Sequence, residues 1–399
     1  MNKTPAVRFI GFAEDWEQRK LGEYVSITSG EAPSKFDKGT ELYVKVDDLN
    51  YNDKYVVDTQ NKVAEHSTVK RVTKGSVVFP KRGAAIMTNK VRIMGIDSYM
   101  DTNMMALTSE KLDSEFLYNI ISKEGLYKIA DTSTIPQINN KHVEPYEVTI
   151  PSLAEQRRIG AYFKQLDHLI TLHQRKYDKL TNVKKSMLEK MFPKNGSNVP
   201  EIRFKGFTDA WEQRKFSELV QIERGGSPRP IDDFITDAPN GLNWVKIGDA
   251  PTQGNYITKT AEKIRPEGLS KTREVHPGDL ILSNSMSFGK PYIMGIDGCI
   301  HDGWLLIRNT YGVFDLTFLC HLLGTPQMLS QYRSFAAGST VNNLNKELVG
   351  NTYVTIPSIT EQRVLGAYLE QLDHLITLHH RKLEKLEQIK QAMLHKMFV

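Results

Sequence analysis

The sequence predicts a mixed α/β protein with an internal repeat, in which two variable domains are joined by two long antiparallel helices related by a pseudo-two-fold axis. Residues 149–192 recur without gaps at 355–398, with 29 of 44 positions identical. A shorter leader at residues 8–20 recurs at 203–215, with nine of 13 positions identical. Between these repeated segments the two halves have little in common. The chain therefore reads as leader, variable block and long repeated segment, followed by the same three parts again.

Length and composition fit a globular protein of several domains. At 399 residues the chain can form two or three domains, each with its own core. Apolar and charged contents of 40% and 25% are ordinary. The repeat predicts four parts, which are residues 1–150 (first domain with its leader), 151–195 (first long helix), 196–356 (second domain with its leader) and 357–399 (second long helix).

Two further features of the composition narrow the cellular setting. No stretch approaches the roughly 18 uninterrupted apolar residues of a membrane span, and the start MNKTPAVRFIGF lacks the apolar core of a secretory signal. We therefore expect a cytoplasmic protein. Its only cysteines, Cys299 and Cys320, exclude a disulfide framework and are expected to be reduced, partly buried thiols.

The net charge of +5 is unevenly distributed. Residues 153–194 carry ten basic and four acidic side chains, and residues 359–399 carry six and five. The rest of the chain is slightly acidic. A surface for a polyanion outside these two segments must therefore be a local patch.

The leaders open each half, and both end in Trp-Glu-Gln-Arg-Lys. Trp16 and Trp211 could stack on a nucleic-acid base, or they could anchor the start of the following block in its core. We favour the packing interpretation.

The variable blocks, Leu21 to Val148 and Phe216 to Val354, have mixed α/β patterns. Strand-like runs occur at residues 42–46, 76–80, 91–96, 243–247, 279–283 and 304–309, and short helices are expected at 114–131 and 315–335. Gly- and Pro-bearing turns, SGEAPSK in the first block and RGGSPRP in the second, occupy corresponding places. A rigid framework with divergent loops is typical of recognition domains.

The long repeated segments are helical by periodicity, with apolar side chains at three-and-four spacing. Ser152 and Ser358, each with a glutamate three residues later, predict capping boxes at the helix starts. Forty helical residues would form a rod of about 60 Å, whose apolar stripe needs a partner, and the near-copy elsewhere in the chain is the natural one. The side chains expected to pair the helices are Leu166, Leu169, His173, Leu180 and Met187 on the first, and Leu372, Leu375, His379, Leu386 and Met393 on the second.

The histidines of these helices could suggest a metal site. His168 and His173 are five residues apart, however, which is the wrong helical spacing for shared ligation, and His374 and His379 copy them. His173 falls on the apolar stripe. We therefore interpret it as a packed interface residue and predict no metal site.

Sequence motifs for catalysis are missing. The chain has no Pro-Pro pair, which removes the Asp/Asn-Pro-Pro-Tyr motif of amino-methyltransferases, and no Gly-x-Gly, which removes the dinucleotide fingerprint. It also has no Glu-x-Lys. These observations favour a protein without catalytic residues.

Together these features resemble the specificity (S) subunit of type I restriction-modification systems. The resemblance covers nearly the whole chain and rests on the Ile-Pro-Ser-x-x-Glu-Gln-Arg starts at Ile150–Arg157 and Ile356–Arg363, each followed by the QLDHLITLH helix. The turn SGEAPS of the first block departs from the double glycine seen in RGGSPRP.

The resemblance implies a DNA-binding subunit without catalytic residues. Each variable block would be a target-recognition domain for one half of a bipartite, asymmetric double-stranded DNA site, and the helices would set the gap between the halves. The helices would also dock two modification (methyltransferase) subunits, with two restriction (translocase and nuclease) subunits joining them. S-adenosylmethionine, ATP and Mg²⁺ would bind to those partners, with no cofactor on this chain.

Base readout requires Arg or Lys for guanine, Asn or Gln for adenine, and Ser or Thr for either, on loops that can enter a groove. The predicted DNA-binding residues of the first block are Lys81, Arg82, Thr88, Asn89, Lys90, Gln137, Asn139, Asn140 and Lys141. Those of the second are Arg224, Arg229, Ser283, Asn284, Ser285, Asn342, Asn343, Asn345 and Lys346. Such polar clusters can also be ordinary surface turns.

Two other classes of function fit the sequence less well. A coiled-coil scaffold or adhesion-like protein would use the two blocks to bind protein or carbohydrate. A self-contained methyltransferase would bind S-adenosylmethionine on the isolated chain.

Overall fold

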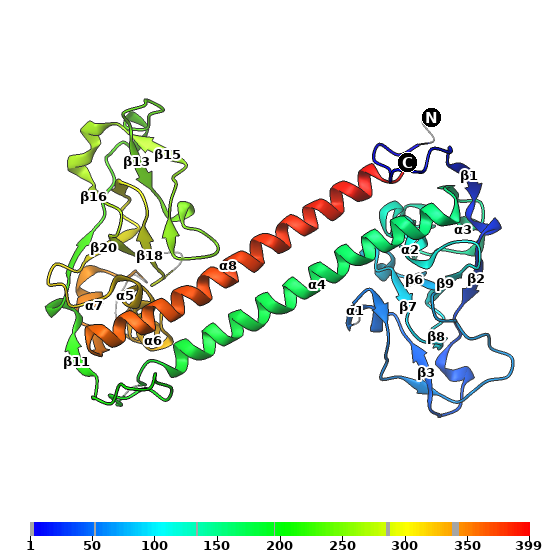
Figure 1. The fold of residues 1–399 in the computed structure, drawn as a ribbon, viewed down its shortest axis with the longest axis horizontal. Helices are drawn as coiled ribbons and strands as arrows, with labels where there is room; N and C mark the ends of the chain where they lie inside the picture. The colour runs from blue at the N-terminus through cyan, green and yellow to red at the C-terminus, as the bar shows by residue number, and fades with distance from the viewer. Residues whose placement is uncertain (1–3, 52, 133–134, 195, 285–287, 337–342) are drawn as a thin grey trace. The chain divides into compact units, whose positions relative to one another are not determined.

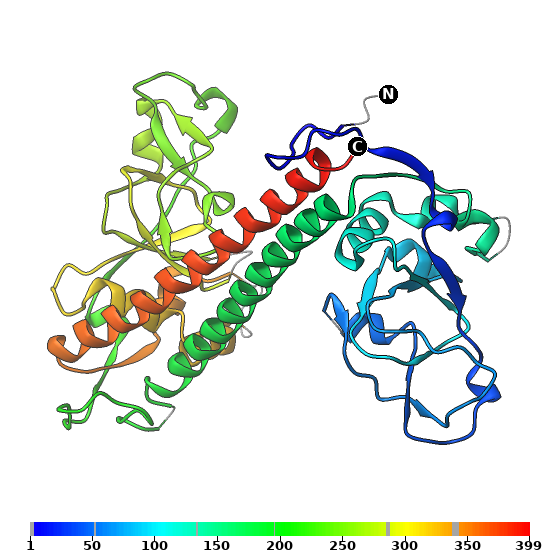
Figure 2. The ribbon, with the colours of Figure 1, turned by 45° about the vertical axis from the view of Figure 1, so that its right-hand side comes forward.

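The computed structural model describes residues 4–51, 53–132, 135–194, 196–284, 288–336 and 343–399. The chain divides into two compact units (Figures 1 and 2). The first contains Met1–Leu172 and Leu383–Val399, and the second contains His173–Lys382. Each unit thus combines one variable block with one end of each long helix. No helix in the described ranges is long and apolar enough to span a bilayer.

The first block is built on a five-stranded sheet. Its order is β2 (Ser26–Ser29), β9 (Met104–Thr108), β6 (Val77–Pro80), β7 (Arg92–Met94) and β4 (Tyr55–Val56), antiparallel except for the β4–β7 pair. A three-stranded sheet has the order β5 (Lys62–Val63), β3 (Glu41–Val44), β8 (Tyr99–Met100). The helices of the block are α1 (Asp48–Tyr51), α2 (Ser114–Glu124) and α3 (Asn140–Val143).

The second block repeats this plan, with a four-stranded accessory sheet in place of the three-stranded sheet of the first block. Its five-stranded sheet has the order β12 (Gln221–Arg224), β20 (Trp304–Arg308), β17 (Leu280–Ser283), β18 (Pro291–Met294), β14 (Tyr256–Ile257). The accessory sheet has the order β15 (Glu262–Ile264), β13 (Leu242–Val245), β19 (Gly298–Ile300), β16 (Arg273–Val275). The helices are α5 (Leu316–Leu323), α6 (Pro326–Ala336) and α7 (Lys346–Gly350).

The central strands are buried on both faces. In β6, Val77 and Phe79 belong to the core that faces α2, whereas Val78 belongs to a second cluster on the other face of the sheet. In β17, Leu280 likewise belongs to the cluster on one face of the sheet and Ile281 to the cluster on the other face. The alternation follows from the two-residue period of a strand, and it explains why these runs are apolar throughout.

All six predicted strand runs are confirmed, as β3, β6, β7, β13, β17 and β20. The two predicted helices are shorter than expected. The first ends at Glu124, because Gly125 has a φ of 69°, in the left-handed region that stops a helix. The second is divided after Leu323, because a new helix begins at Pro326, a residue suited to the first turn.

The leaders form strands that the sequence did not predict. β1 (Glu17–Lys20) pairs antiparallel with β10 (Glu147–Ile150), and β11 (Glu212–Lys215) pairs with β21 (Tyr353–Ile356). Each ribbon brings the entry of a block beside its exit, immediately before a long helix begins. The sequence did not predict β1 and β11, because Glu-Gln-Arg-Lys has no alternation of apolar and polar residues and none of its side chains is buried.

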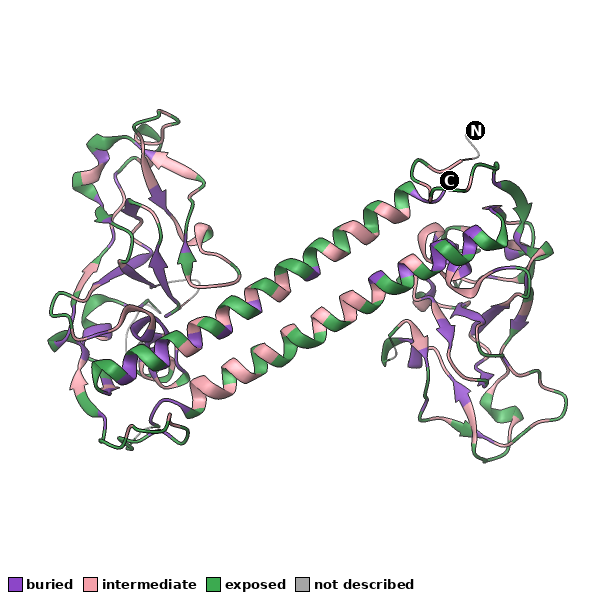
Figure 3. Cartoon of the chain, in the orientation of Figure 1, coloured by how far each residue is buried: buried purple, intermediate pink, exposed green. Residues whose placement is uncertain are grey.

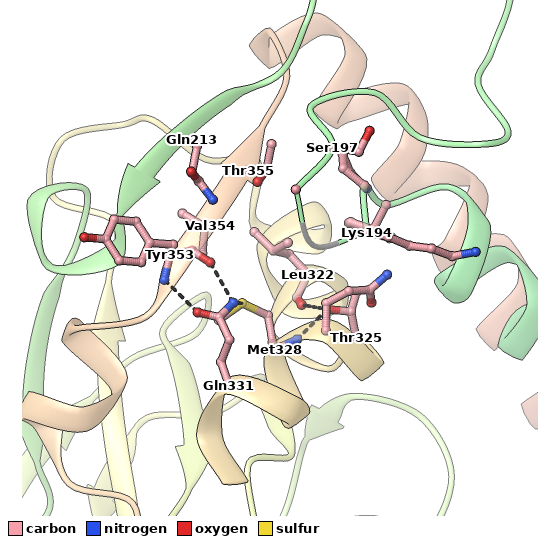
Figure 4. Close-up of a pocket in the computed structure, with 14 residues that line it drawn as sticks. Lys194, Ser197, Gln213, Leu322, Thr325, Met328, Gln331, Tyr353, Val354 and Thr355 are labelled. Carbon is pink, nitrogen blue, oxygen red and sulfur yellow. Dashed lines mark hydrogen bonds between the residues drawn. The ribbon is translucent and has the colours of Figure 1, made fainter. Parts of the chain in front are cut away.

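A side chain continues the second ribbon, as Figure 4 shows. The Gln331 amide nitrogen donates to the Tyr353 carbonyl at 2.9 Å, and the Tyr353 N–H donates to the Gln331 amide oxygen at 2.9 Å. These bonds lie beside a cavity of about 50 Å³ lined mainly by the segment that follows the first long helix and by residues of α6 and β21. Gln331 thus satisfies the backbone N–H and carbonyl of Tyr353 at an edge of β21 that is otherwise unpaired in the described part of the chain.

The long helices are α4 (Leu153–Lys190) and α8 (Ile359–Lys396). In the first unit, Leu166 in the first half of α4 shares a core with Met393 in the last turn of α8 and with Met397 just after it. In the second unit, Met187 near the end of α4 packs against the core that contains Leu365 near the start of α8. In the first unit the first half of α4 thus packs with the end of α8, and in the second unit the end of α4 packs with the start of α8. This confirms the predicted antiparallel pairing (Figure 1).

The predicted pairing residues differ in burial, as Figure 3 shows for the helices. Leu166 and Leu372 are buried; Leu169, His173, Leu180, Met187, His379, Leu386 and Met393 are half-buried. Leu375 is 40% exposed, because the neighbouring Ile376 takes the buried position at 6%.

His173 and His379 contact each other in the second unit. Their Nδ1 atoms are 2.8 Å apart and their ring centroids are 5.0 Å apart. The contact agrees with the interpretation of His173 as a packed residue of the helix seam, whereas His168 and His374 are exposed.

Candidate nucleic-acid interface

The polar residues that begin each long helix attach it to the leader. The Arg8 guanidinium donates to both carboxylate oxygens of Glu155, at 2.7 Å each. Arg203 forms the same pair with Glu361, at 2.7 and 2.8 Å. Both glutamates are buried, and the bidentate geometry satisfies their carboxylates.

This pairing corrects the predicted capping boxes. Ser152 Oγ accepts weakly from the Glu155 N–H, at 3.4 Å, but the Glu155 carboxylate binds Arg8 instead of returning to the serine backbone. The Ser358 and Glu361 pair behaves likewise. The prediction was wrong because a charged partner from a distant part of the chain forms a stronger bond than a local N–H.

The glutamine that follows attaches the helix to its block. Gln156 Oε1 accepts from the Asp113 N–H at 3.1 Å, and Gln156 Nε2 donates to the Pro151 carbonyl at 2.9 Å. Asp113 in turn caps α2. Gln362 and Asp315 repeat the arrangement in the second unit.

Glycines allow this close approach. A Cβ at Gly160 would lie 2.5 Å from Asp113 Oδ1, and one at Gly366 would lie 2.8 Å from Asp315 Oδ1. The start of each block helix therefore rests directly on the backbone of a long helix.

The leader tryptophans are packing anchors, as predicted. Trp16 is 1% exposed and lies edge-on to Phe116 and Phe398, with centroid distances of 5.9 and 6.2 Å. Trp211 lies edge-on to Phe192 and Phe318, both at 6.1 Å. The Met-Phe that ends each repeated segment thus enters the core beneath a leader.

Two of the predicted recognition segments of the first block come together. The Lys81 carbonyl accepts from the Ile138 N–H at 2.8 Å, and the Gly83 N–H donates to the Pro136 carbonyl at 2.8 Å. Arg82 also forms a backbone bridge with Gln137. Residues of these segments with exposed or half-buried side chains are Lys81, Arg82, Gln137, Asn139, Asn140 and Lys141.

Lys81 lies in a partly desolvated position within this group. Burial lowers the pKa of its ammonium; Glu31 and Asp101 raise it, and the positive charge of Arg82 lowers it further. Because burial disfavours the charged form of Lys81, an anionic partner would stabilise that form.

The remaining predicted residues of the first block lie farther along the same loop. Asn89 has a φ of 47° and donates to the Ser122 carbonyl at 2.9 Å, which gives it a local structural role. Thr88 donates to the Ala85 carbonyl at 2.6 Å, and Lys90 bonds Asn50.

The second block joins its corresponding segments through the same backbone bonds. The Asn284 N–H donates to the Gly303 carbonyl and the Asn284 carbonyl accepts from the Leu344 N–H, both at 3.0 Å. In the first block, Lys81 makes these two bonds with Asn103 and Ile138, at 2.8 Å each. The loop framework is shared although its side chains differ.

Ser283 and Asn284 are buried and hold the loop. Ser283 Oγ accepts from the Lys290 N–H at 3.0 Å, and Asn284 Nδ2 donates to the Asp302 carbonyl at 2.8 Å. Asn345 caps α7 by accepting from the Leu348 N–H at 2.8 Å. Asn343 and Lys346 are exposed, while Ser285 and Asn342 lie outside the described residues.

Asp302 connects the entry turn of the second block to this loop, a role that its sequence context did not indicate. Its carbonyl accepts from Arg224 Nε at 3.5 Å, and its carboxylate lies 3.8 Å from Arg229. Ser227 Oγ donates to the carboxylate at 2.9 Å. Arg224 and Arg229 are both exposed, so their guanidinium groups remain accessible. Whether these side chains contact bases stays a prediction.

The architecture defines a class of protein: two blocks of one fold, with divergent loops, attached by the same contacts to a shared antiparallel helix pair. The model of the type I restriction modification DNA specificity domain matches residues 13–182 and 208–388. The chain therefore belongs to this family, the specificity subunits of type I restriction-modification systems. These are DNA-recognition subunits without catalytic activity.

Individual relatives match over almost their full length. The type I restriction enzyme MjaVIII specificity subunit of Methanocaldococcus jannaschii is 23% identical over 406 residues, covering 96% of this chain and 92% of the relative. The putative MjaX specificity subunit of the same organism is 21% identical over 409 residues, with the same coverage.

Solved structures show the same fold. The S subunit of a type I system from M. genitalium superposes with a TM-score of 0.66 at 14% identity, over 99% of each chain. A chain from a study of complex assembly and conformational transition of the type I R-M system has a TM-score of 0.52 at 19% identity. It covers 96% of this chain and 97% of its own length.

Proposed function

We propose that each variable block reads one half of a bipartite, asymmetric DNA site. The observation that carries the proposal is the shared loop framework, in which Lys81 and Asn284 make equivalent backbone bonds while the neighbouring side chains differ. A framework of this kind holds two recognition surfaces in equivalent places and lets each have its own sequence preference.

The side chains suit base-edge contacts in a major groove. Arg82 can donate two bonds to the O6 and N7 of a guanine, and the amide of the exposed Asn140 can pair with adenine. The amides of Gln137 and Asn139 bond each other, at 2.8 Å. In the second block the accessible groups are the guanidiniums of Arg224 and Arg229 and the amide of Asn343. Lys81, Lys141 and Lys346 would contact phosphates, which position the protein without reading sequence.

The helices α4 and α8 would set the gap between the half-sites and dock the partners. Their outward faces carry many exposed charged residues, with Arg157, Arg175 and Lys179 on α4 as examples. Two modification subunits would bind along the helices, and two restriction subunits would join them. The relative in the assembly study belongs to such a system. S-adenosylmethionine, ATP and Mg²⁺ would bind on those partners.

The test is competitive DNA binding by the chain reconstituted with its methyltransferase subunits. A labelled genomic library is selected for binding, and the recovered duplexes are sequenced. We expect two short motifs at a fixed separation to be enriched. Binding that is equally well competed by random duplex DNA would contradict the proposal.

A further inference from the structure

The aspartate of the repeated QLDHLITLH segment joins each block to both long helices. In the first unit, Asp167 Oδ2 lies 2.7 Å from Lys54 Nζ, and Asp167 Oδ1 lies 2.7 Å from Lys390 Nζ. Lys54 immediately precedes the sheet-edge strand β4, and Lys390 belongs to α8. One carboxylate thus connects α4, α8 and the edge of the block's main sheet.

Lys54 is the buried centre of this contact. Its side chain is 9% exposed, its ammonium lies 2.6 Å from Glu115 Oε2 on α2, and it stacks over Tyr118 at 4.4 Å. Burial lowers the pKa of Lys54, but Asp167 and Glu115 outweigh it and the pKa is raised overall. The ammonium is therefore charged and paired with carboxylates from two different elements.

The second unit repeats the helix part of this contact and changes the block part. Asp373 pairs with Lys184 of α4, as Asp167 pairs with Lys390. From the block, Asn255 Nδ2 donates to Asp373 Oδ2 at 2.8 Å, and Asn255 precedes β14 as Lys54 precedes β4. His321 Nε2 of α5 lies 3.6 Å from the same oxygen. An amide thus stands where the first unit has an ammonium.

The aspartate lies well away from the attachment at the start of its helix. The attachment through Arg8 and Glu155 lies at the start of α4, twelve residues before Asp167, which is about 18 Å along a helix. Between these two points, Ile159, Phe163 and Leu166 of α4 belong to the same buried core as Phe116 of the block. The Asp167 contact is a polar attachment at the far edge of this packing, where it opposes a rotation of the block on the helix pair.

We propose that Asp167 and Asp373 are positioning residues that fix the angle of each block on the helices and thereby restrict the length of DNA between the two half-sites. The inference rests on the proposed function. It adds a specificity role for two residues of the long helices, outside the proposed recognition loops.

The experiment measures gap discrimination by the full chain reconstituted with its methyltransferase subunits. Duplexes carry both half-sites with the gap at its preferred length, one base pair shorter or one longer, and the affinity ratios are compared. Asp167→Asn keeps the shape and removes the charge. We expect the discrimination to fall by about tenfold, because a charge-assisted hydrogen bond contributes about that factor to an equilibrium.

Two further variants make the result specific. Lys54→Met removes the other partner, and the double variant with Asp167→Asn should lose no more discrimination than either single change. Asp178→Asn is the matched control, because Asp178 is an exposed residue of α4 whose carboxylate accepts from Gln174 within the same helix. It should leave the ratios unchanged. Asp373→Asn should show the effect from the second unit if the first-unit variants fold poorly.

The outcomes separate the two proposals. If the wild-type complex discriminates between gaps but Asp167→Asn, Lys54→Met and Asp373→Asn bind all gaps with unchanged ratios, the positioning role is overturned even if thermal stability falls. If the wild-type complex shows no gap preference, the proposed function fails, and the inference fails with it.

Discussion

The two units of the molecule are alike where each block meets the helices and unlike where its loops face solvent. Arg8 with Glu155 is matched by Arg203 with Glu361, down to the bidentate geometry. Around the shared loop framework the exposed side chains differ, with Arg82, Asn140 and Lys141 in the first unit and Arg224, Arg229 and Asn343 in the second. The repeated residues are therefore those that attach a block, and the divergent ones are those available for recognition.

The attachment of the second unit is nevertheless not a copy of the first. Lys54, between two carboxylates, is replaced by Asn255, and Tyr118 above it is replaced by the buried Cys320. A cavity of about 420 Å³ lies beside α8 in this unit, lined by Asn255, Cys320 and Asp373 among others. The block thus contacts the repeated aspartate through an ion pair in the first unit and through a neutral amide in the second.

The largest loss of stability is expected when one phenylalanine in the core of either unit is truncated. Phe398→Ala should destabilise the first unit, and Phe192→Ala the second, by about 4 kcal/mol each, because truncating a buried phenylalanine leaves a cavity. Hydrogen exchange of the intact chain locates the loss. Faster exchange should be confined to the first unit, residues 1–172 and 383–399, for the first variant and to the second unit, residues 173–382, for the second. Equal loosening of both blocks by either variant would show that the units do not have separate cores.

The leader ion pairs should give the next effect. Arg8→Met leaves the carboxylate of Glu155, which is 1% exposed, without its partner and should cost about 3 kcal/mol in urea unfolding. Adding Glu155→Gln should restore part of the loss, since no unpaired charge remains buried. Arg203→Met should cost at least as much, because Arg203 also donates to the Asp209 carbonyl at 2.6 Å. A smaller loss for Arg203→Met would contradict the equivalence of the pairs.

Helix capping should give a smaller loss. Asp113→Ala and Asp315→Ala should each lower the free energy of unfolding by about 1 kcal/mol. Asp113 accepts from two backbone N–H groups, at 3.1 and 3.0 Å, whereas Asp315 accepts from one N–H and from the Thr317 hydroxyl. Asp113→Asn, which can still cap, is the control and should lose much less.

The histidine pair should give the smallest effect, as a dependence on pH. Burial lowers the pKa of both His173 and His379 below 6.5, and the charges of Lys176 and Lys382 add to the effect. The unfolded chain then binds more protons in the window below pH 6.5, so the unfolding free energy is at its full value above that pH and falls as the pH is lowered.

The double variant His173→Gln with His379→Gln should flatten this fall when unfolding is measured between pH 5 and 7. A slope from His321 remains, because burial lowers its pKa to about 4. An unchanged slope in the double variant would show that the pair does not titrate as described.

Much of the fold follows from periodicity and repetition. The apolar stripe of Leu166, Leu180 and Met187 needs a partner along its whole length, and only its own copy provides one. The buried central strands are equally clear, because runs such as Val77–Pro80 are apolar on both faces.

The contacts that attach the blocks could not be predicted, because they join residues far apart in the sequence. Nothing near Arg8 indicates that its guanidinium binds Glu155, and the local capping pattern of Ser152 pointed to a different bond. Lys54 looks like any surface lysine until the fold brings Asp167 and Glu115 to it. The pairing of the loops around Lys81 and Ile138 likewise depends on tertiary structure.

Exchanging one block tests most directly whether each block reads its own half-site. Residues 21–148 are replaced by the corresponding block of another family member, the complex is reconstituted with its methyltransferase subunits, and the methylated positions of genomic DNA are determined by single-molecule sequencing. We expect one half of the modified motif to change while the other half stays the same. A change in both halves, or in neither, would contradict the assignment of one half-site to each block.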